Sequence, residues 1–80
     1  MSKLLYMAAS GAQDPTRCSI PFHLAVNGAV PAGHEAAVVL AGDATELLKP
    51  DLLSSVRGVG VPPLAELVGL CPERGVRIHV

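Results

Sequence analysis

The sequence has no cluster of basic residues and no long apolar run. Six basic and seven acidic residues give a net charge of −1 and are spread along the chain, which argues against a nucleic-acid partner. No apolar stretch approaches the roughly 20 residues of a membrane helix, so we expect no membrane association. The apolar segment 4–9 is also shorter than the roughly 7–15-residue core of a signal peptide.

The two cysteines, Cys18 and Cys71, form no close pair. There is no CxxC motif and no Cys/His spacing of the zinc-binding kind, so we predict neither a metal nor a cofactor. Two reduced thiols are typical of a cytoplasmic protein. A serine triad and a pair of glycosidase-type carboxylates are also missing, which argues against a self-sufficient hydrolase and leaves open whether the chain is an enzyme.

What the sequence does contain supports one small domain over residues 1–80. Half of the residues are apolar, which is too many for a disordered chain. Eight glycines and seven prolines predict frequent turns and few long helices.

Three segments have the composition of β-strands: 3–9, 35–41 and 76–80. In the first two segments the residues on both faces of the strand are apolar, which is typical of central parallel strands with helices on both sides. In the third, Arg77 and His79 interrupt the apolar residues. This alternation indicates a wetter face, as at a sheet edge or a subunit boundary.

The first helix is expected to begin at Asp14-Pro15, since Asp caps free N–H groups and Pro fits the first helical position. It extends to about Val30, with a kink or a late start caused by Pro21. The three- and four-residue spacing predicts a buried face formed by Ile20 and Leu24, with Ala25 and Gly28 as further candidates.

Two more helical segments follow the second strand. Asp43 and Glu46 have the spacing of a capping box, which opens a short helix that Pro50 closes. A turn over 52–56 and a loop over 57–63 lead to a helix over 63–74, with Leu64, Leu67, Val68 and Cys71 on one face.

The order β-α-β-α-α-β predicts an α/β fold with a parallel sheet and right-handed crossovers. We expect a three-layer αβα arrangement in which the first strand is central, giving the strand order 2-1-3. Three strands leave two free edges, and a core this small gains from self-association. We therefore predict a homo-oligomer, a dimer or trimer, that buries apolar helix surface.

Several segments in the same order cover essentially the whole chain and together resemble the DsrE-like family. They are Ser10-Gly11-Ala12-Gln13-Asp14-Pro15-Thr16-Arg17 with Ser19-Ile20-Pro21-Phe22-His23-Leu24-Ala25; Ala32-Gly33-His34-Glu35 leading to Gly42-Asp43-Ala44; and Gly58-Val59-Gly60-Val61-Pro62-Pro63-Leu64-Ala65-Glu66-Leu67. The resemblance implies a parallel sheet flanked by helices and assembly into dimers, trimers or hexamers. Some family members relay sulfur as a cysteine persulfide, and many have no established reaction.

This resemblance leaves two functions open. The first is a DsrE-like protein of unknown reaction that works as an oligomeric binding or accessory module. The second is a sulfur- or selenium-transfer protein, with a sulfur-relay protein as partner. In many relatives a cysteine-bearing loop follows the strand that matches Val76–Val80. The reactive residue of such a transfer protein would therefore lie just after Val80 in a longer gene product. Family chains are longer than this one, and three explanations of the difference are open: a natural short form, a truncated form, or a gene that continues through a codon such as that for selenocysteine.

Cys18 is the candidate catalytic residue. It lies near a helix start, where the helix dipole lowers the pKa of a thiol, and Arg17 adds positive charge beside it. A buried cysteine with a packing role is the alternative.

The candidate ligand-binding residues form three groups. Ser10, Gly11, Thr16 and Arg17 lie where a strand gives way to a helix, which is either an anion site or a plain capped turn. His23 and Asn27 are four residues apart on one helix face and form either an acid–base pair or a packing contact. Gly58 and Gly60 form either a pocket wall or a tight structural turn.

Overall fold

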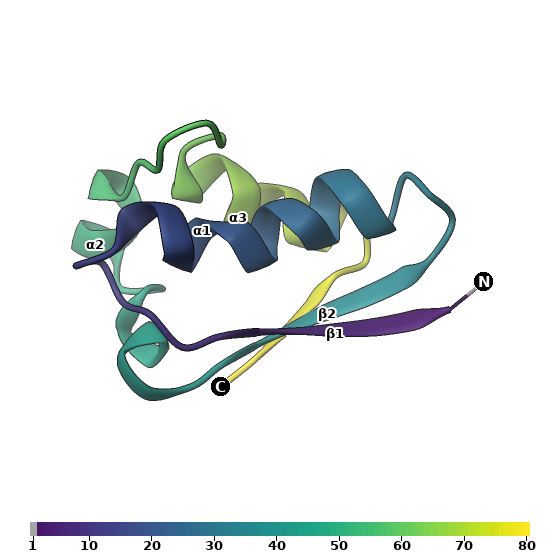
Figure 1. The fold of residues 1–80 in the computed structure, drawn as a ribbon, viewed down its shortest axis with the longest axis horizontal. Coiled ribbons are helices and arrows are strands. Elements are labelled where there is room, and N and C mark those ends of the chain that lie inside the picture. The colour runs from purple at the N-terminus through teal and green to yellow at the C-terminus, as the bar shows by residue number, and fades with distance from the viewer. Residues whose placement is uncertain (1) are drawn as a thin grey trace.

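Residues 2–80, which the computed structural model describes, form three parallel strands and the helices that connect them (Figure 1). In chain order the elements are β1 (Lys3–Ala8), α1 (Pro15–Leu24), the π-helical turn η1 (Ala25–Ala29), β2 (Glu35–Leu40), the 3₁₀ helix η2 (Gly42–Glu46), α2 (Pro50–Ser55), α3 (Leu64–Glu73) and β3 (Arg77–His79). The α/β class and the predicted positions of the three strands are confirmed.

The predicted strand order is wrong, because the central strand is β2. β2 pairs in parallel with β1 on one side, where Tyr6 lies beside Val38, and with β3 on the other, where Val38 lies beside Ile78. The order is therefore 1-2-3 instead of 2-1-3. β1 and β3 are the two edges.

The predicted three-layer arrangement is wrong for the same reason. Parallel crossovers are right-handed, so two successive steps in one direction across a sheet carry both connections over the same face. A 2-1-3 order would reverse direction after the first step and place helices on both faces. In residues 2–80 the helices cover one face, and the other is open (Figure 1).

The core lies between this covered face and the helices. β2 alternates cleanly, since Ala36, Val38 and Leu40 are buried and the residues between them are not. The buried side chains come from every layer: Ala8, Cys18, Phe22, Ala25, Val26, Ala29, Ala36, Val38, Leu40, Ala44, Leu47, Val56, Leu64, Leu67, Cys71 and Val76.

α1 begins where the sequence predicts. The side chain of Asp14 accepts a hydrogen bond from the N–H of Arg17 at 3.1 Å, and Pro15 occupies the first helical position. The predicted buried face is right only at Ala25, which is buried. Ile20 and Leu24 are 41% and 44% exposed, and Phe22 is buried in their place. Two apolar stripes run along α1, and the helix turns the other one to the core.

The π-helical turn leaves one backbone acceptor without its usual donor. The N–H of Val30 bonds to the carbonyl five residues before it, at 3.2 Å, and so does not reach the carbonyl of Val26. Pro31 has no N–H to replace it. Arg74 supplies the bond instead: its Nη1 donates to the Val26 carbonyl at 2.6 Å and to Asn27 Oδ1 at 2.8 Å. Arg74 thereby ties the end of α3 to η1.

The segment after β2 differs from the predicted capping box. η2 begins at Gly42, and Asp43 lies inside its first turn and makes no cap bond. Its carboxylate instead accepts from Gln13 Nε2 at 3.1 Å. Pro50 does not simply close this helix but begins α2. No helix within residues 2–80 is long and apolar enough to cross a membrane.

Replacing Arg74 tests the role of its two hydrogen bonds. Arg74→Met should lower the free energy of unfolding by about 1–3 kcal/mol, because it leaves the Val26 carbonyl without a donor. Arg77→Met, at an exposed arginine of β3, is the matched control and should change it by less than about 0.5 kcal/mol. Urea unfolding of the three proteins measures both effects, and equal losses from the two variants would contradict the assigned role.

Candidate functional site

The loops at the carboxyl ends of β1 and β2 pack tightly against each other. This is the edge where ligands bind in open α/β sheets. Gly11 is buried there, and a Cβ added to it would lie 3.0 Å from both the Cβ and the carbonyl oxygen of Asp43. Ser10, beside it, is half-buried. Gly11 therefore allows two loops to approach closely, which supports its structural reading.

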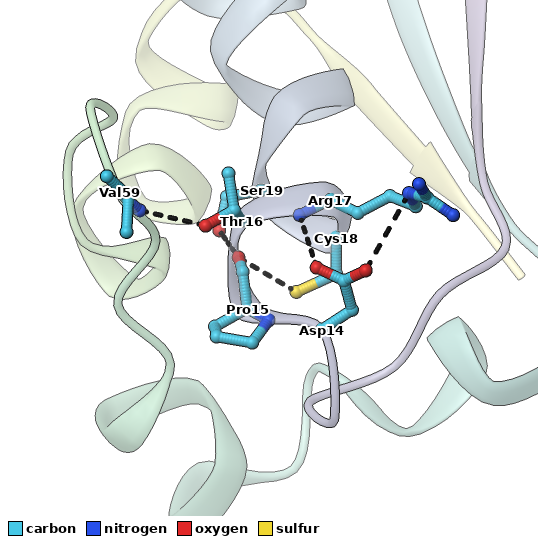
Figure 2. Close-up of polar contacts among 7 residues, drawn as sticks. All are labelled: Asp14, Pro15, Thr16, Arg17, Cys18, Ser19 and Val59. Atoms are coloured by element: carbon cyan, nitrogen blue, oxygen red, sulfur yellow. Dashed lines mark hydrogen bonds and ion pairs between the residues drawn. The ribbon is translucent and has the colours of Figure 1, made fainter.

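The first turn of α1 already holds a carboxylate (Figure 2). Asp14 Oδ1 accepts from the N–H of Arg17, and Asp14 Oδ2 lies 3.7 Å from Arg17 Nε. Pro15 has no N–H to offer. An external anion at this turn would meet the negative charge of Asp14 and compete with it for Arg17. The contacts favour the plain capped turn over the anion site.

The glycine loop rests on the same turn. Thr16 Oγ1 accepts a hydrogen bond from the N–H of Val59 at 2.9 Å (Figure 2). A Cβ at Gly58 would lie 2.9 Å from Thr16 Cα and 3.1 Å from the Pro15 carbonyl oxygen. Gly60 has a φ of +76°, a left-handed conformation that glycine adopts without strain. The structure thus brings Thr16 and Gly58 together, but as a contact between two parts of the chain.

Cys18 is buried, and its Sγ lies 3.4 Å from the Pro15 carbonyl oxygen (Figure 2). Burial raises the pKa of the Cys18 thiol, and the carboxylate of Asp14 adds to the increase. The position of Cys18 near a helix start predicts a lowered thiol pKa, so the shift is opposite to the one expected. Cys71 is buried as well, and burial also raises the pKa of its thiol. Both environments favour the unreactive protonated thiol.

His23 and Asn27 do face each other, as their spacing predicts. Asn27 Nδ2 and His23 Nδ1 are 3.2 Å apart. Asn27 also accepts the hydrogen bond from Arg74, which the sequence analysis did not identify. The pair is therefore part of the contact that joins η1 to α3. The one sequence signal for this contact is Pro31, whose missing N–H leaves helix carbonyls in need of another donor.

Two open hollows lie at opposite ends of the sheet, and none of the predicted site residues lines either of these two. The hollow at the amino ends of the strands has a volume of about 620 Å³, and its lining includes Lys3, Glu35 and Arg77. The hollow at the carboxyl end measures about 360 Å³, and its lining includes Asp43 and Glu46. Within residues 2–80, no group of three or more His, Cys, Asp and Glu side chains could hold a metal ion.

The most distinctive surface is the uncovered side of the sheet, which we call the open face. Its apolar part consists of Leu5, Met7, Ala37 and Val39. Lys3 and Glu35 lie at one end of it, and Arg77 and His79 of β3 lie beside Ala37 and Val39. Leu5 and Met7 are 66% and 65% exposed, and the two β2 residues are half-buried. The sequence of β1 gives no sign of this face, because every position from Leu4 to Ala8 is apolar and no polar alternation marks one side as exposed.

The chain has no match among family models, curated proteins or solved structures. The DsrE-like resemblance therefore stays a prediction.

Replacing Gly58 tests the close approach of the glycine loop to α1. Gly58→Ala should lower the free energy of unfolding by about 1–3 kcal/mol, because the new Cβ overlaps the backbone of Thr16. Gly69→Ala, in α3, is the matched control: its Cβ meets nothing within 4 Å, and it should raise that free energy by about 0.5–1 kcal/mol. Urea unfolding measures both, and a neutral Gly58→Ala would contradict the contact.

Thiol labelling tests the environment of the cysteines. At pH 6–7 the native protein should react slowly with a maleimide, and urea should raise the rate as it unfolds the chain, because both thiols are buried with raised pKa values. Val59→Cys, at a side chain that is 84% exposed, gives the rate of an accessible thiol. Native Cys18 labelled as fast as this variant would contradict the account.

Proposed function

We propose that this chain is a DsrE-like accessory protein that works as a self-associating binding module and carries out no reaction with its own thiols. The observation that supports this most directly is the open face. Leu5, Met7, Ala37 and Val39 form an uncovered apolar group, and such a group bordered by charged residues is typical of an interaction site.

Two further features support binding over catalysis. The candidate residues at the carboxyl edge of the sheet contact one another and line neither hollow. The thiol of Cys18, which a sulfur carrier would have to expose, is buried with a raised pKa. These contacts are better suited to hold the fold together than to bind and turn over a small molecule.

Sulfur or selenium transfer is the alternative function. In the version that uses Cys18, the thiolate would have to form while the side chain is out of contact with solvent. In the version with a reactive residue beyond Val80, the alternative stays a prediction, because it concerns no residue of this chain.

Sedimentation velocity tests the self-association. We expect a dimer or trimer at about micromolar concentration, the range of modest protein–protein affinity. Met7→Lys should weaken the association about tenfold or more, because a charge then stands among the apolar residues. Val59→Lys, which changes an exposed apolar residue of the 57–63 loop, should leave it unchanged. A wild-type protein that stays monomeric at about 100 µM would contradict the proposed function.

A further inference from the structure

Most of the exposed large apolar side chains belong to two elements of the fold. Among residues 2–80, seven large hydrophobic side chains are exposed, and five of these belong to β1 and α1: Leu4, Leu5, Met7, Ile20 and Leu24. The two elements pack against each other, with α1 over the covered face of the sheet (Figure 1). β1 and the helix that packs on it thus account for most of the apolar surface that the described residues expose.

Backbone groups along this edge are available for pairing. The carbonyls of Ser2 and Ala8 accept from amides on the β2 side, each at 2.9 Å. Because the hydrogen-bonding groups of successive residues in a strand point to opposite sides, those of Lys3, Leu5 and Met7 point away from β2. Such a row of free N–H and C=O groups is a template for another strand.

The two edges of the sheet differ in how they are protected. Natural edge strands resist pairing when they are short or carry charges. β3 has both protections: it is three residues long, and it contains Arg77 and His79. β1 is six residues long, and its only charged residue, Lys3, is the first. The β1 edge is thus long, apolar and unprotected.

We propose that β1 pairs antiparallel with β1 of a second copy of the chain, about a two-fold axis perpendicular to the sheet. This rests on the proposed function and names the surface through which the chain self-associates. The pairing joins two three-stranded sheets into one continuous sheet of six strands.

The charge of the strand favours a second copy in this orientation. An antiparallel pair places the two Lys3 side chains at opposite ends of the seam, whereas a parallel pair would set them side by side. The register that pairs the whole apolar run 4–8 with the same run of the second copy, and leaves both Lys3 residues outside it, sets Leu5 opposite Met7 of the second copy. In this register Leu5 and Met7 can form a hydrogen-bonded pair, because the backbone N–H and C=O groups of both residues point away from β2.

The pairing also enlarges the open face. The two-fold axis keeps both open faces on the same side of the joined sheet, so Leu5 and Met7 of the two copies lie next to one another in one continuous apolar strip.

Disulfide cross-linking tests both the seam and its register. The Leu5→Cys and Met7→Cys variants are prepared separately. Each variant is oxidised with diamide by itself, and an equal mixture of the two variants is oxidised in the same way. Opposite residues of an antiparallel pair are about 5.5 Å apart at Cα, within disulfide range, whereas diagonal residues are about 7–8 Å apart. The mixture should therefore form several-fold more covalent dimer than either variant alone. Val59→Cys gives the background from random collisions, and the native thiols are buried.

The outcomes separate the two proposals. A mixture that cross-links no more than Val59→Cys overturns the β1 seam, and Leu5→Cys alone cross-linking as well as the mixture overturns the register. Sedimentation of the wild-type protein is the second measurement. If the wild-type protein sediments as a dimer but the cysteine variants do not cross-link, the proposed function holds and the β1 seam is wrong. If the wild-type protein sediments as a monomer, the proposed function itself is wrong. Both substituted side chains are about two-thirds exposed, so the variants should fold.

Discussion

The position of β2 between β1 and β3 determines most of what this protein exposes. Because the chain steps from β1 to β2 to β3 in one direction, its right-handed connections all pass over the same face of the sheet. The core forms on that side, where β2 packs against η1, and Val38 and Leu40 belong to the same buried cluster as side chains of α1 and α3. Leu5 and Met7 are left on the other side. The open face and the unprotected β1 edge thus both follow from the strand order.

The carboxyl edge of the sheet is occupied by contacts within the chain. Gly11 and Gly58 sit where a Cβ would overlap neighbouring backbone, and the hydroxyl of Thr16 and the guanidinium of Arg17 already have partners. A residue pattern that is typical of a ligand site can equally be produced by loops that pack closely. The surface that remains available for function is therefore the sheet itself.

The sequence predicts local structure well here and long-range arrangement poorly. The Asp14 cap, the strand positions and the buried stripe of α3 depend on neighbouring residues, and all were predictable. Strand order was not, because Leu4–Ala8 is apolar throughout and gives the same pattern in a central strand and in an edge strand. The choice between the two apolar stripes of α1, which exposes Ile20 and Leu24, depends on that order. The pairing of Arg74 with η1 joins residues 48 apart, so no local pattern reports it.

The central claim is that β2 is the middle strand, and nuclear Overhauser contacts between backbone protons of the strands test it most directly. The account predicts cross-strand contacts between Tyr6 and Val38 and between Val38 and Ile78, with none between Tyr6 and Ile78. Direct contacts between β1 and β3 would place β1 in the centre. They would contradict the one-sided helix layer and everything inferred from the open face.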